Sequence, residues 1–319
     1  MPIMSLLYGG GRKRREVIKL AGGLFFCLFL AHLVLPDYSR SREWHLNGDR
    51  QHPSVLGKVT SSVIDDDEET LPELAQRHGL GYNEITLANP DVDPWYPGEH
   101  TRISIPGSWI MPRASYTVRH DPGIIINLGE LRLYFLDQGE HEDVVTTFPV
   151  GIGRQGSETD TGRYWVTVRK ENPTWTIPSS LRDEYPEGLR EVPPGPANPL
   201  GDYALRLSRN DYMIHGTNNP LGIGRRVSHG CIRMYPEDIE KLYNLTPVDC
   251  EVLIVYETVK VGSKDGTPFI EVHPDYLNDS DQHKVARHLL VQQGLWKKCD
   301  LVLLHQAVEE KKGVPVSLQ

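Results

Sequence analysis

The spacing of hydrophobic and polar positions changes along the chain and separates it into stretches of different character. Between residues 116 and 256, apolar positions alternate with polar ones in short runs separated by Gly and Pro, as in β-strands. The expected strands cover residues 124–128, 131–136, 144–150, 163–168, 204–207, 213–214 and 251–256. The pattern predicts a mainly β domain, a β-sandwich with one or two short helices, the clearest of which begins at Pro236.

A smaller unit precedes this domain at residues 59–106. Strands are expected at 59–64 and 101–105, and a second helix at 82–88, which ends before Asn89-Pro90. The first helix follows Thr70, a suitable N-cap, and Glu73 completes a capping box. The order strand–helix–helix–strand predicts a small βααβ domain.

The N-terminus has the pattern of an export segment. A basic cluster is followed by an almost wholly apolar run, Leu20–Leu35. Such a pattern indicates a secretory signal peptide or an uncleaved signal anchor over residues 1–36. The run is shorter than the about 20 residues of a spanning helix, and no clear cleavage site follows, so cleavage and anchoring both remain open. The basic flank predicts that the rest of the chain lies outside the cytoplasm. Residues 37–58 are polar, without periodicity, and are expected to form a linker.

The amino-acid composition and charge of the chain exclude several classes of protein. The chain has 319 residues, of which 39% are hydrophobic and 24% charged, which excludes wholesale disorder and a polytopic membrane protein. The net charge is −9; the first 35 residues carry +4, so the remainder carries −13 (−9 less +4). An acidic chain of this kind is not expected to bind nucleic acid.

Four cysteines are too few for a disulfide scaffold of this length. After export, Cys231, Cys250 and Cys299 would face an oxidising compartment. Cys250 and Cys299 could then pair and leave Cys231 as a thiol, but the sequence does not establish that pairing.

The strongest candidate for chemistry is Cys231. A cysteine acts as a nucleophile only as thiolate, so it needs a base or positive potential nearby. His229 is close in sequence but lies in the same tight loop, whereas His215 ends a strand that would hold its ring in place. The carbonyl of Gly216 could accept a hydrogen bond from the second ring nitrogen of His215, as the third member of a catalytic triad does.

Other residues around Cys231 suggest roles in binding. Gly230 lets the backbone bend, and the N–H groups of Gly230 and Cys231 could form an oxyanion hole. The planar fork of Arg233 could pair with a substrate carboxylate. A structural cysteine and a zinc site are the alternatives, but His-x-Cys in a glycine turn lacks the paired spacing of zinc ligands. A helix is also expected at 281–297; its histidines, His283 and His288, are five apart and not on one face, so no metal site is expected there.

These motifs resemble those of a known enzyme family. His215-Gly216-Thr217 with Ser228-His229-Gly230-Cys231-Ile232-Arg233 is similar to the signature of L,D-transpeptidases, also called the YkuD-like domain. Residues 113–256 are therefore identified as the expected catalytic domain. The similarity includes residues 149–153, 172–175, 197–201 and Thr159-Asp160-Thr161-Gly162, where many members have Thr-Pro-x-Gly; no function is assigned to that change.

The resemblance implies a mechanism. Cys231 would be the nucleophile and His215 the base, held by Gly216, while Ser228, His229 and Gly230 shape the site. The donor would be a tetrapeptide stem of peptidoglycan, from which D-Ala leaves to give a thioester. An amine then accepts the acyl group, either the diamino acid of another stem or a lysine of an envelope lipoprotein. No cofactor and no metal are expected. An L,D-carboxypeptidase, which admits water, and a non-catalytic peptidoglycan-binding anchor are the alternatives.

Residues 59–106 resemble a second family. Thr70-Leu71, Ala88-Asn89-Pro90, Gly98 and Ile105-Pro106 occur in an order similar to that of LysM modules, which bind glycans containing N-acetylglucosamine. The combination resembles Gram-negative envelope enzymes and implies a periplasmic location, with membrane contact only through the N-terminal segment. Residues 257–319 have no assigned role.

Overall fold

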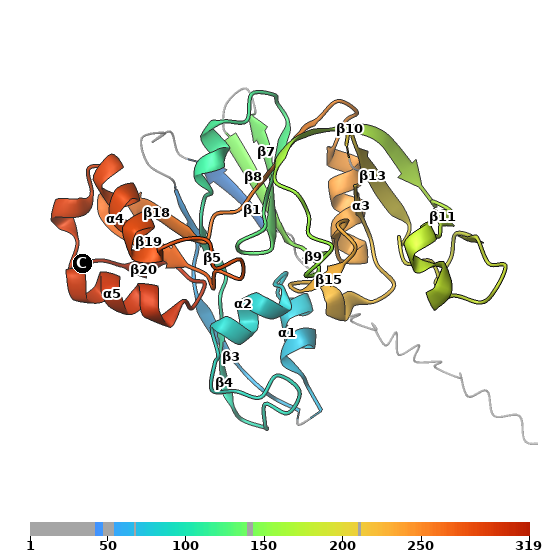
Figure 1. The fold of residues 1–319 in the computed structure, drawn as a ribbon. Coiled ribbons are helices and arrows are strands. Elements are labelled where there is room, and N and C mark those ends of the chain that lie inside the picture. The colour runs from blue at the N-terminus through green and yellow to red at the C-terminus, as the bar shows by residue number, and fades with distance from the viewer. Residues whose placement is uncertain (1–41, 47–53, 67, 139–142, 210–211) are drawn as a thin grey trace, which may run out of the picture. The chain divides into compact units, whose positions relative to one another are not determined.

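The computed structural model describes residues 42–46, 54–66, 68–138, 143–209 and 212–319 (Figure 1). The expected export segment at 1–36 lies outside the described residues. Among the residues that are described, no helix has both the length and the apolar character needed to cross a membrane.

The largest element is a sheet of nine strands, in the order β1-β8-β7-β6-β17-β10-β13-β14-β16. Most neighbours are antiparallel, but β17 pairs with β6, and β14 with β16, in parallel. The strands are β1 (Arg42–Leu46), β6 (Gly123–Asn127), β7 (Arg132–Gln138), β8 (Asp143–Pro149), β10 (Gly162–Glu171), β13 (Tyr203–Leu207), β14 (Met213–His215), β16 (Ile232–Arg233) and β17 (Glu251–Val255). The expectation of a mainly β fold is confirmed.

Strand β10 changes its pairing partner partway along its length. The first half of this strand pairs with β17, and the second half pairs with β13 from Val166 onward, with a bulge in that ladder between Val166 and Val168. A bulge bends its strand and increases the local twist, so one long strand can take part in two halves of a curled sheet.

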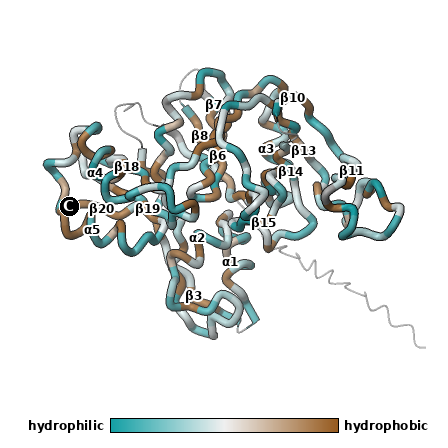
Figure 2. Tube along the Cα trace, viewed as in Figure 1, coloured by the Kyte–Doolittle hydropathy of each residue, from teal (hydrophilic) through white to brown (hydrophobic). Residues whose placement is uncertain are grey.

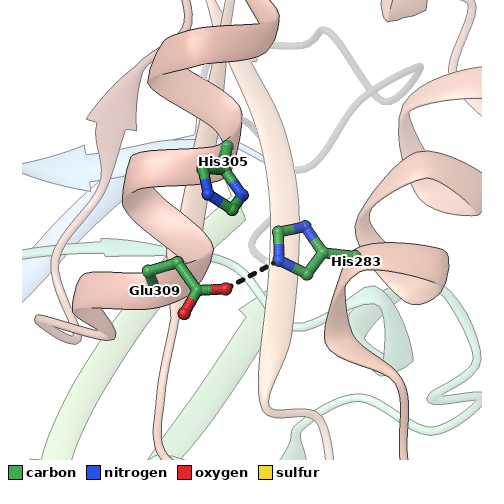
Figure 3. Close-up of side chains that lie close together, drawn as sticks. All are labelled: His283, His305 and Glu309. Carbon is green, nitrogen blue, oxygen red and sulfur yellow. Dashed lines mark hydrogen bonds and ion pairs between the residues drawn. The ribbon is translucent and has the colours of Figure 1, made fainter.

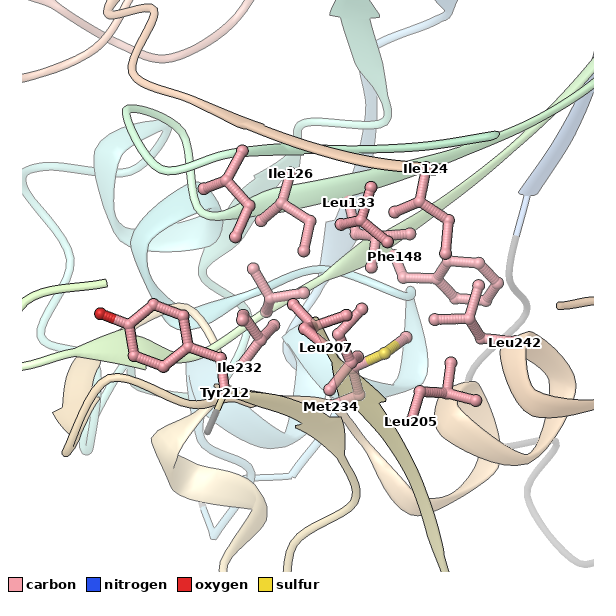
Figure 4. Close-up of a cluster of buried hydrophobic side chains, with 14 of the residues drawn as sticks. Ile124, Ile126, Leu133, Phe148, Leu205, Leu207, Tyr212, Ile232, Met234 and Leu242 are labelled. Carbon is pink, nitrogen blue, oxygen red and sulfur yellow. The ribbon is translucent and has the colours of Figure 1, made fainter. Parts of the chain in front are cut away.

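The main core lies between the two halves of this sheet and helix α3 (Pro236–Leu245). Strand side chains such as Ile126, Leu133 and Leu205 belong to one buried cluster with Leu242 of the helix, and all four are fully buried (Figure 4). Figure 2 shows hydrophobic positions along β6 and β8, which contribute to this core. The helix begins with Pro236 at its first turn, followed by Glu237 and Asp238, as its sequence predicts.

The βααβ unit has the predicted order of elements. Strands β3 (Thr60–Val63) and β4 (Arg102–Ile105) pair antiparallel, with α1 (Leu71–Arg77) and α2 (Tyr82–Leu87) between them in the chain. Thr70 caps α1, and both hydrogen bonds of the capping box with Glu73 are present. A separate cluster of buried side chains, including Leu74, Ile85 and Ile103, forms its core.

A buried ion pair joins this unit to the large sheet. Arg132 of β7 donates from Nε and Nη2 to the two carboxylate oxygens of Glu84 of α2, at 2.9 and 2.8 Å. The same carboxylate accepts the indole N–H of Trp109 at 2.7 Å, and the guanidinium lies 4.0 Å from the centre of that ring. Because neither charged side chain has access to water, these contacts compensate for the cost of burying both charges.

The prediction of a linker at 37–58 is wrong for two described segments. Residues Arg42–Leu46 form β1 at the edge of the large sheet, and β2 (Val55–Gly57) pairs with β5 (Ser108–Ile110). The polar composition misled the prediction because an edge strand needs only one apolar face. Trp44 supplies the apolar contact, since it packs against two of the buried clusters.

Smaller elements complete the region 113–245. They are η1 (Arg113–Tyr116), β9 (Ile152–Gly153), β11 (Trp175–Thr176), η2 (Ser179–Glu184), β12 (Glu191–Val192), η3 (Pro220–Gly222) and β15 (Arg226–Ser228). Strand β9 pairs with β15 and β11 with β12.

Residues 257–319 form a packed unit that the sequence did not reveal. Strands β18 (Val259–Lys264), β19 (Thr267–Val272) and β20 (Val316–Ser317) form a sheet, and α4 (Gln282–Gln292) and α5 (Leu301–Glu310) share a buried cluster with it. A short turn, η4 (Trp296–Lys298), separates the two helices. The expected helix at 281–297 is confirmed in its first part and ends earlier, before Gly294 at φ +67°.

A cluster of buried charges connects this unit to the large sheet. Lys260 of β18 lies 2.5 Å from Glu130, in the turn between β6 and β7, and 2.8 Å from Glu271 of β19. Glu271 also contacts His273 and accepts the backbone N–H of Ile110. Although burial alone lowers the pKa of Lys260, the two carboxylates raise it, and the lysine is therefore charged.

Candidate active site

Strand alternation places His215 and Arg233 on one face of the sheet, beside Cys231. In the parallel pair of β14 and β16, Ile214 is opposite Ile232, and His215 is opposite Arg233. The two isoleucines are fully buried in the main core. Because successive side chains of a strand point to opposite faces, His215 and Arg233 face away from that core. Cys231 directly precedes β16, and all three residues line one cleft.

The contact predicted for His215 is present. Its ring is buried, and Nδ1 lies 2.6 Å from the carbonyl oxygen of Gly216. A carbonyl oxygen can only accept, so Nδ1 carries the proton and donates it in this hydrogen bond. The other ring nitrogen, Nε2, therefore holds a lone pair in the neutral imidazole.

The surroundings of His215 keep this ring neutral. Burial, and then the positive charge of Arg233, lower its pKa from 6.5 to about 4. At neutral pH the side chain is therefore a proton acceptor rather than a cation.

The turn that carries Cys231 is held by Ser228. The buried Ser228 hydroxyl donates to the carbonyl of Cys231 and accepts the backbone N–H of Gly230 at 3.2 Å. The amide of Gly230, expected in an oxyanion hole, is thus engaged within the turn, which argues against that role for Gly230. The same role for the Cys231 N–H stays a prediction.

Two further residues support the turn, and sequence reasoning missed both. The hydroxyl of Thr159 donates to the carbonyl of Gly230 at 2.8 Å and accepts the N–H of Gly153 at 3.0 Å. The hydroxyl of Tyr212 accepts the N–H of Asp160 at 3.2 Å, and its ring lies beside Gly230. The motif Thr159–Gly162 was the available signal, but it gave no indication of contact with a turn some 70 residues later.

Gly230 allows a conformation that other residues adopt only with strain. Its φ is +105°, and a Cβ at this position would lie 2.8 Å from Cε1 of Tyr212. Replacing Gly230 with Ala should destabilise the protein by about 1–3 kcal/mol and displace Cys231, with loss of activity. Denaturant unfolding and a turnover assay would measure the two effects.

Gly156 offers a matched control. Its φ is +81°, and nothing lies within 4 Å of the corresponding Cβ position. Gly156→Ala should therefore carry conformational strain without a collision, and it should retain activity. If Gly230→Ala and Gly156→Ala were equally stable and equally active, the close packing of Tyr212 against Gly230 would not be what holds the Cys231 turn in place.

The cleft has a volume of about 760 Å³ and extends well beyond the Cys231 thiol. Its walls come from β10, β13 and the excursion between them on one side, and from β14, β15, β16 and the Cys231 turn on the other. They comprise Val168, Lys170, Pro173, Thr174, Trp175, Thr176, Pro178, Leu181, Glu184, Tyr185, Pro199, Leu200, Ala204, Arg206, Tyr212, Met213, His215, Ser228, His229, Cys231 and Arg233. The segment 186–199 is rich in Pro and Gly, a composition that is common in binding loops. Of that loop only Pro199 lines the cleft, and the wall is formed instead by residues 173–185.

The excursion between β10 and β13 is internally braced. Strands β11 and β12 pair within it, and the rings of Trp175 and Tyr185 meet edge to face with centroids 5.3 Å apart. The side-chain amide of the buried Asn198 donates to the carbonyl of Pro173 at 2.7 Å. These contacts give the cleft an aromatic wall that faces the strands carrying His215.

The ionisable side chains in the lining are mostly basic. Lys170, Arg206 and Arg233 contribute positive charge, and Glu184 is the acidic residue among the described lining residues. His229 lies at the open edge of the cleft, where partial loss of hydration, and then the positive charge of Arg154, lower its pKa. A cleft of this charge suits a ligand that carries carboxylates.

None of the three described cysteines forms a disulfide. Cys250 belongs to the main core, where burial raises its thiol pKa to about 12, and Cys299 packs against the core of the C-terminal unit. The pairing of Cys250 with Cys299, left open by the sequence, is therefore absent. Cys231 is the one of the three that lines the cleft.

Comparison with known proteins supports a family assignment. The model of the L,D-transpeptidase catalytic domain (YkuD) matches residues 121–261. The chain is 30% identical over 312 residues to a probable L,D-transpeptidase, YcfS, of Escherichia coli K12, covering 93% of this chain and 94% of that protein. It is 38% identical over 311 residues to a probable L,D-transpeptidase, ErfK/SrfK, of Salmonella typhimurium, covering 92% and 95%.

Solved L,D-transpeptidase structures align more weakly with this chain. The catalytic domain of the E. faecium L,D-transpeptidase aligns with 20% identity and a TM-score of 0.32, covering 43% of this chain and 98% of that one. L,D-transpeptidase 3 from Mycobacterium tuberculosis aligns with 16% identity and a TM-score of 0.32, covering 49% and 75%. The identity to YcfS and ErfK/SrfK extends over almost the whole length of both proteins, and on that basis the chain belongs to the L,D-transpeptidase family.

Proposed function

We propose that the chain is a peptidoglycan L,D-transpeptidase in which Cys231 is the nucleophile. The observation that carries this proposal is the hydrogen bond from His215 Nδ1 to the Gly216 carbonyl, which leaves a basic Nε2 in the cleft of Cys231. A neutral base beside a thiol supplies the thiolate that attack on a carbonyl requires. Membership of the family supports peptidoglycan as the substrate.

In the proposed reaction, His215 Nε2 takes the proton of the Cys231 thiol. The sulfur attacks the carbonyl between the L-centre of the diamino acid and the terminal D-Ala of a tetrapeptide stem. The C–N bond breaks, His215 returns the proton to the departing D-Ala amine, and a thioester remains on Cys231. An amine then attacks the thioester and restores the free thiol. No step of this sequence requires a metal or a nucleotide.

The basic lining residues would bind the donor. Peptidoglycan stems carry carboxylates, and Lys170, Arg206 and Arg233 place positive charge along the cleft. Arg233 lines the cleft beside Cys231, and its planar guanidinium suits a carboxylate. Ser228, Gly230 and His229 shape the turn and the mouth of the site.

Three versions of the proposed function differ in the molecule that accepts the acyl group. A diamino acid of another stem would give a cross-link, a lipoprotein lysine would give an attached lipoprotein, and water would make the enzyme an L,D-carboxypeptidase. Incubation of a tetrapeptide muropeptide with and without each amine, with products identified by mass, distinguishes them. Release of D-Ala without any cross-linked product would favour the carboxypeptidase. A complete lack of D-Ala release would favour the non-catalytic anchor and refute both enzymes.

The pKa of His215 sets the expected pH dependence of catalysis. With a folded-state pKa of about 4, the base remains neutral well below pH 6.5, so kcat/KM should decline only as the pH approaches 4. The unfolded chain takes up the same proton near pH 6.5, so the free energy of unfolding should also fall between 6.5 and 4. Initial rates across this range, with folding monitored by circular dichroism, check the prediction. An acidic limb centred near 6.5 would contradict a buried, neutral His215.

We also propose that residues 59–106 are a LysM-like module that binds the glycan of the same polymer. The βααβ order and the capped first helix support this assignment. A module on the substrate polymer raises the effective concentration of the catalytic domain at its stems. The full chain should sediment with insoluble peptidoglycan, and N-acetylglucosamine oligomers should compete for it. Unchanged sedimentation in excess oligomer would contradict glycan binding.

The proposed location is the periplasm. Its support is the basic cluster and apolar run of the N-terminal segment, which would be removed or serve as the membrane anchor. The substrate itself lies in the same compartment.

A further inference from the structure

Two helices of the C-terminal unit bring three metal-ligating side chains together. His283 lies near the start of α4, and His305 and Glu309 are one turn apart on α5, so both face the same way (Figure 3). The His283 Nε2 lies 2.9 Å from Oε1 of Glu309, and the rings of His283 and His305 stack with centroids 5.2 Å apart. One potential ligand atom from each residue lies within 4.8 Å of the other two.

This separation is near the spacing that a small divalent ion needs. Zn²⁺ binds imidazole nitrogen and carboxylate oxygen at about 2.0–2.2 Å, so tetrahedral ligand atoms lie about 3.3–3.6 Å apart. The three ligand atoms lie within 4.8 Å of one another, so binding would require the side chains to rotate toward the ion. Since all three residues are exposed, water can enter and complete the coordination.

An ion pair between His283 and Glu309 does not by itself account for the cluster. That ion pair involves only the imidazole of His283, whereas the imidazole of His305 stacks on it as a second potential metal ligand. No metal site is expected from His283 and His288, which lie five residues apart on one helix. The second histidine of the cluster comes instead from α5, a helix that the sequence did not predict.

A second group of ligand types, Glu130, Glu271 and His273, is different in character. It is completely buried, and the ammonium group of Lys260 lies 2.5 Å from Glu130 and 2.8 Å from Glu271. A positive charge thus already pairs with both carboxylates. In the exposed cluster on α4 and α5, Lys311 lies near Glu309 but is the smallest of the influences on its carboxylate, after His283 and His305, and the three side chains are open to solvent.

We propose that His283, His305 and Glu309 form a surface site for a divalent transition metal, with Zn²⁺ as the best match to two imidazoles and one carboxylate. The ligands come from both helices, so the bound ion connects α4 to α5 and stabilises the C-terminal unit. This site is separate from the cysteine chemistry proposed above, which requires no metal.

The test uses the untagged chain with Cys231→Ala, which removes the thiol of the cleft as a competing ligand. Zn²⁺ alone is titrated by calorimetry, and thermal unfolding is followed with and without the ion. We expect one saturable equivalent and a melting temperature that rises with Zn²⁺ concentration. His283→Gln and His305→Gln should each weaken binding by more than about 100-fold, which exceeds the loss of an outer-sphere partner. Both should also abolish the rise in melting temperature.

His288→Gln is the matched control, since this residue is exposed on the same helix outside the cluster. It should bind Zn²⁺ as the parent does. Because the altered side chains are exposed, the zinc-free melting temperatures of all variants should equal that of the parent. Absence of saturable binding, or binding of equal strength in His283→Gln and His305→Gln, would overturn the proposal.

Discussion

Replacement of Cys231 by alanine should abolish the release of D-Ala from a tetrapeptide stem while the fold is retained. The thiol is half-exposed at the cleft, and removal of its sulfur deletes the nucleophile without opening a large cavity. Loss of a catalytic nucleophile costs about 10⁴-fold or more in kcat. Product analysis by mass spectrometry measures the loss, and thermal unfolding checks the fold.

Cys299→Ala provides the control for general loss of a thiol. Cys299 is also partly exposed, but it packs against the C-terminal core and is absent from the cleft lining. This variant should retain full turnover. Residual activity in Cys231→Ala near that of the parent, or equal losses in both variants, would be incompatible with Cys231 as the nucleophile.

Lys260→Met should cause the largest loss of stability among the changes considered away from the cleft. Lys260, Glu130 and Glu271 are each at most 1% exposed, and the ammonium group contacts both carboxylates. Breaking a buried ion pair from one side costs about 3–5 kcal/mol, because it leaves a charge without compensation. Here two carboxylates would be left, and they link the C-terminal unit to the large sheet. The free energy of unfolding in denaturant measures the effect.

Two further variants isolate the cause of that loss. Lys264→Met removes an exposed lysine from the same strand and should change stability by less than about 0.5 kcal/mol. Adding Glu271→Gln to Lys260→Met removes one of the uncompensated charges and should recover part of the stability. If Lys260→Met were as stable as Lys264→Met, the buried cluster would not hold the C-terminal unit to the sheet.

Local signals predicted much of the fold. The period-two runs predicted seven of the nine strands of the large sheet, all except β1 and β16, and the Thr70–Glu73 pair located the start of α1. These features depend on residues close in sequence, where propensity and capping act directly. Local signals were misleading for residues 37–58. Strand β1 is polar in composition, and its position depends on pairing with β8, about 100 residues later in the chain.

The candidate site was predictable to a similar degree. The role of the Gly216 carbonyl beside His215 followed from adjacent residues, and the structure has that contact. The support of the Cys231 turn by Thr159 and Tyr212 depends on contacts between distant segments. The same reason explains why His305 was not considered as a partner of His283, since its helix was not foreseen.

The central claim is that Cys231 carries the acyl group during the reaction. Incubation with a tetrapeptide muropeptide without an amine acceptor, followed by rapid acid quenching, intact-mass measurement and peptide mapping, tests it most directly. The account predicts an adduct with the mass of the stem less D-Ala, on the peptide that contains Cys231, which disappears when an amine is added. Release of D-Ala accompanied by an adduct on a different residue would contradict it.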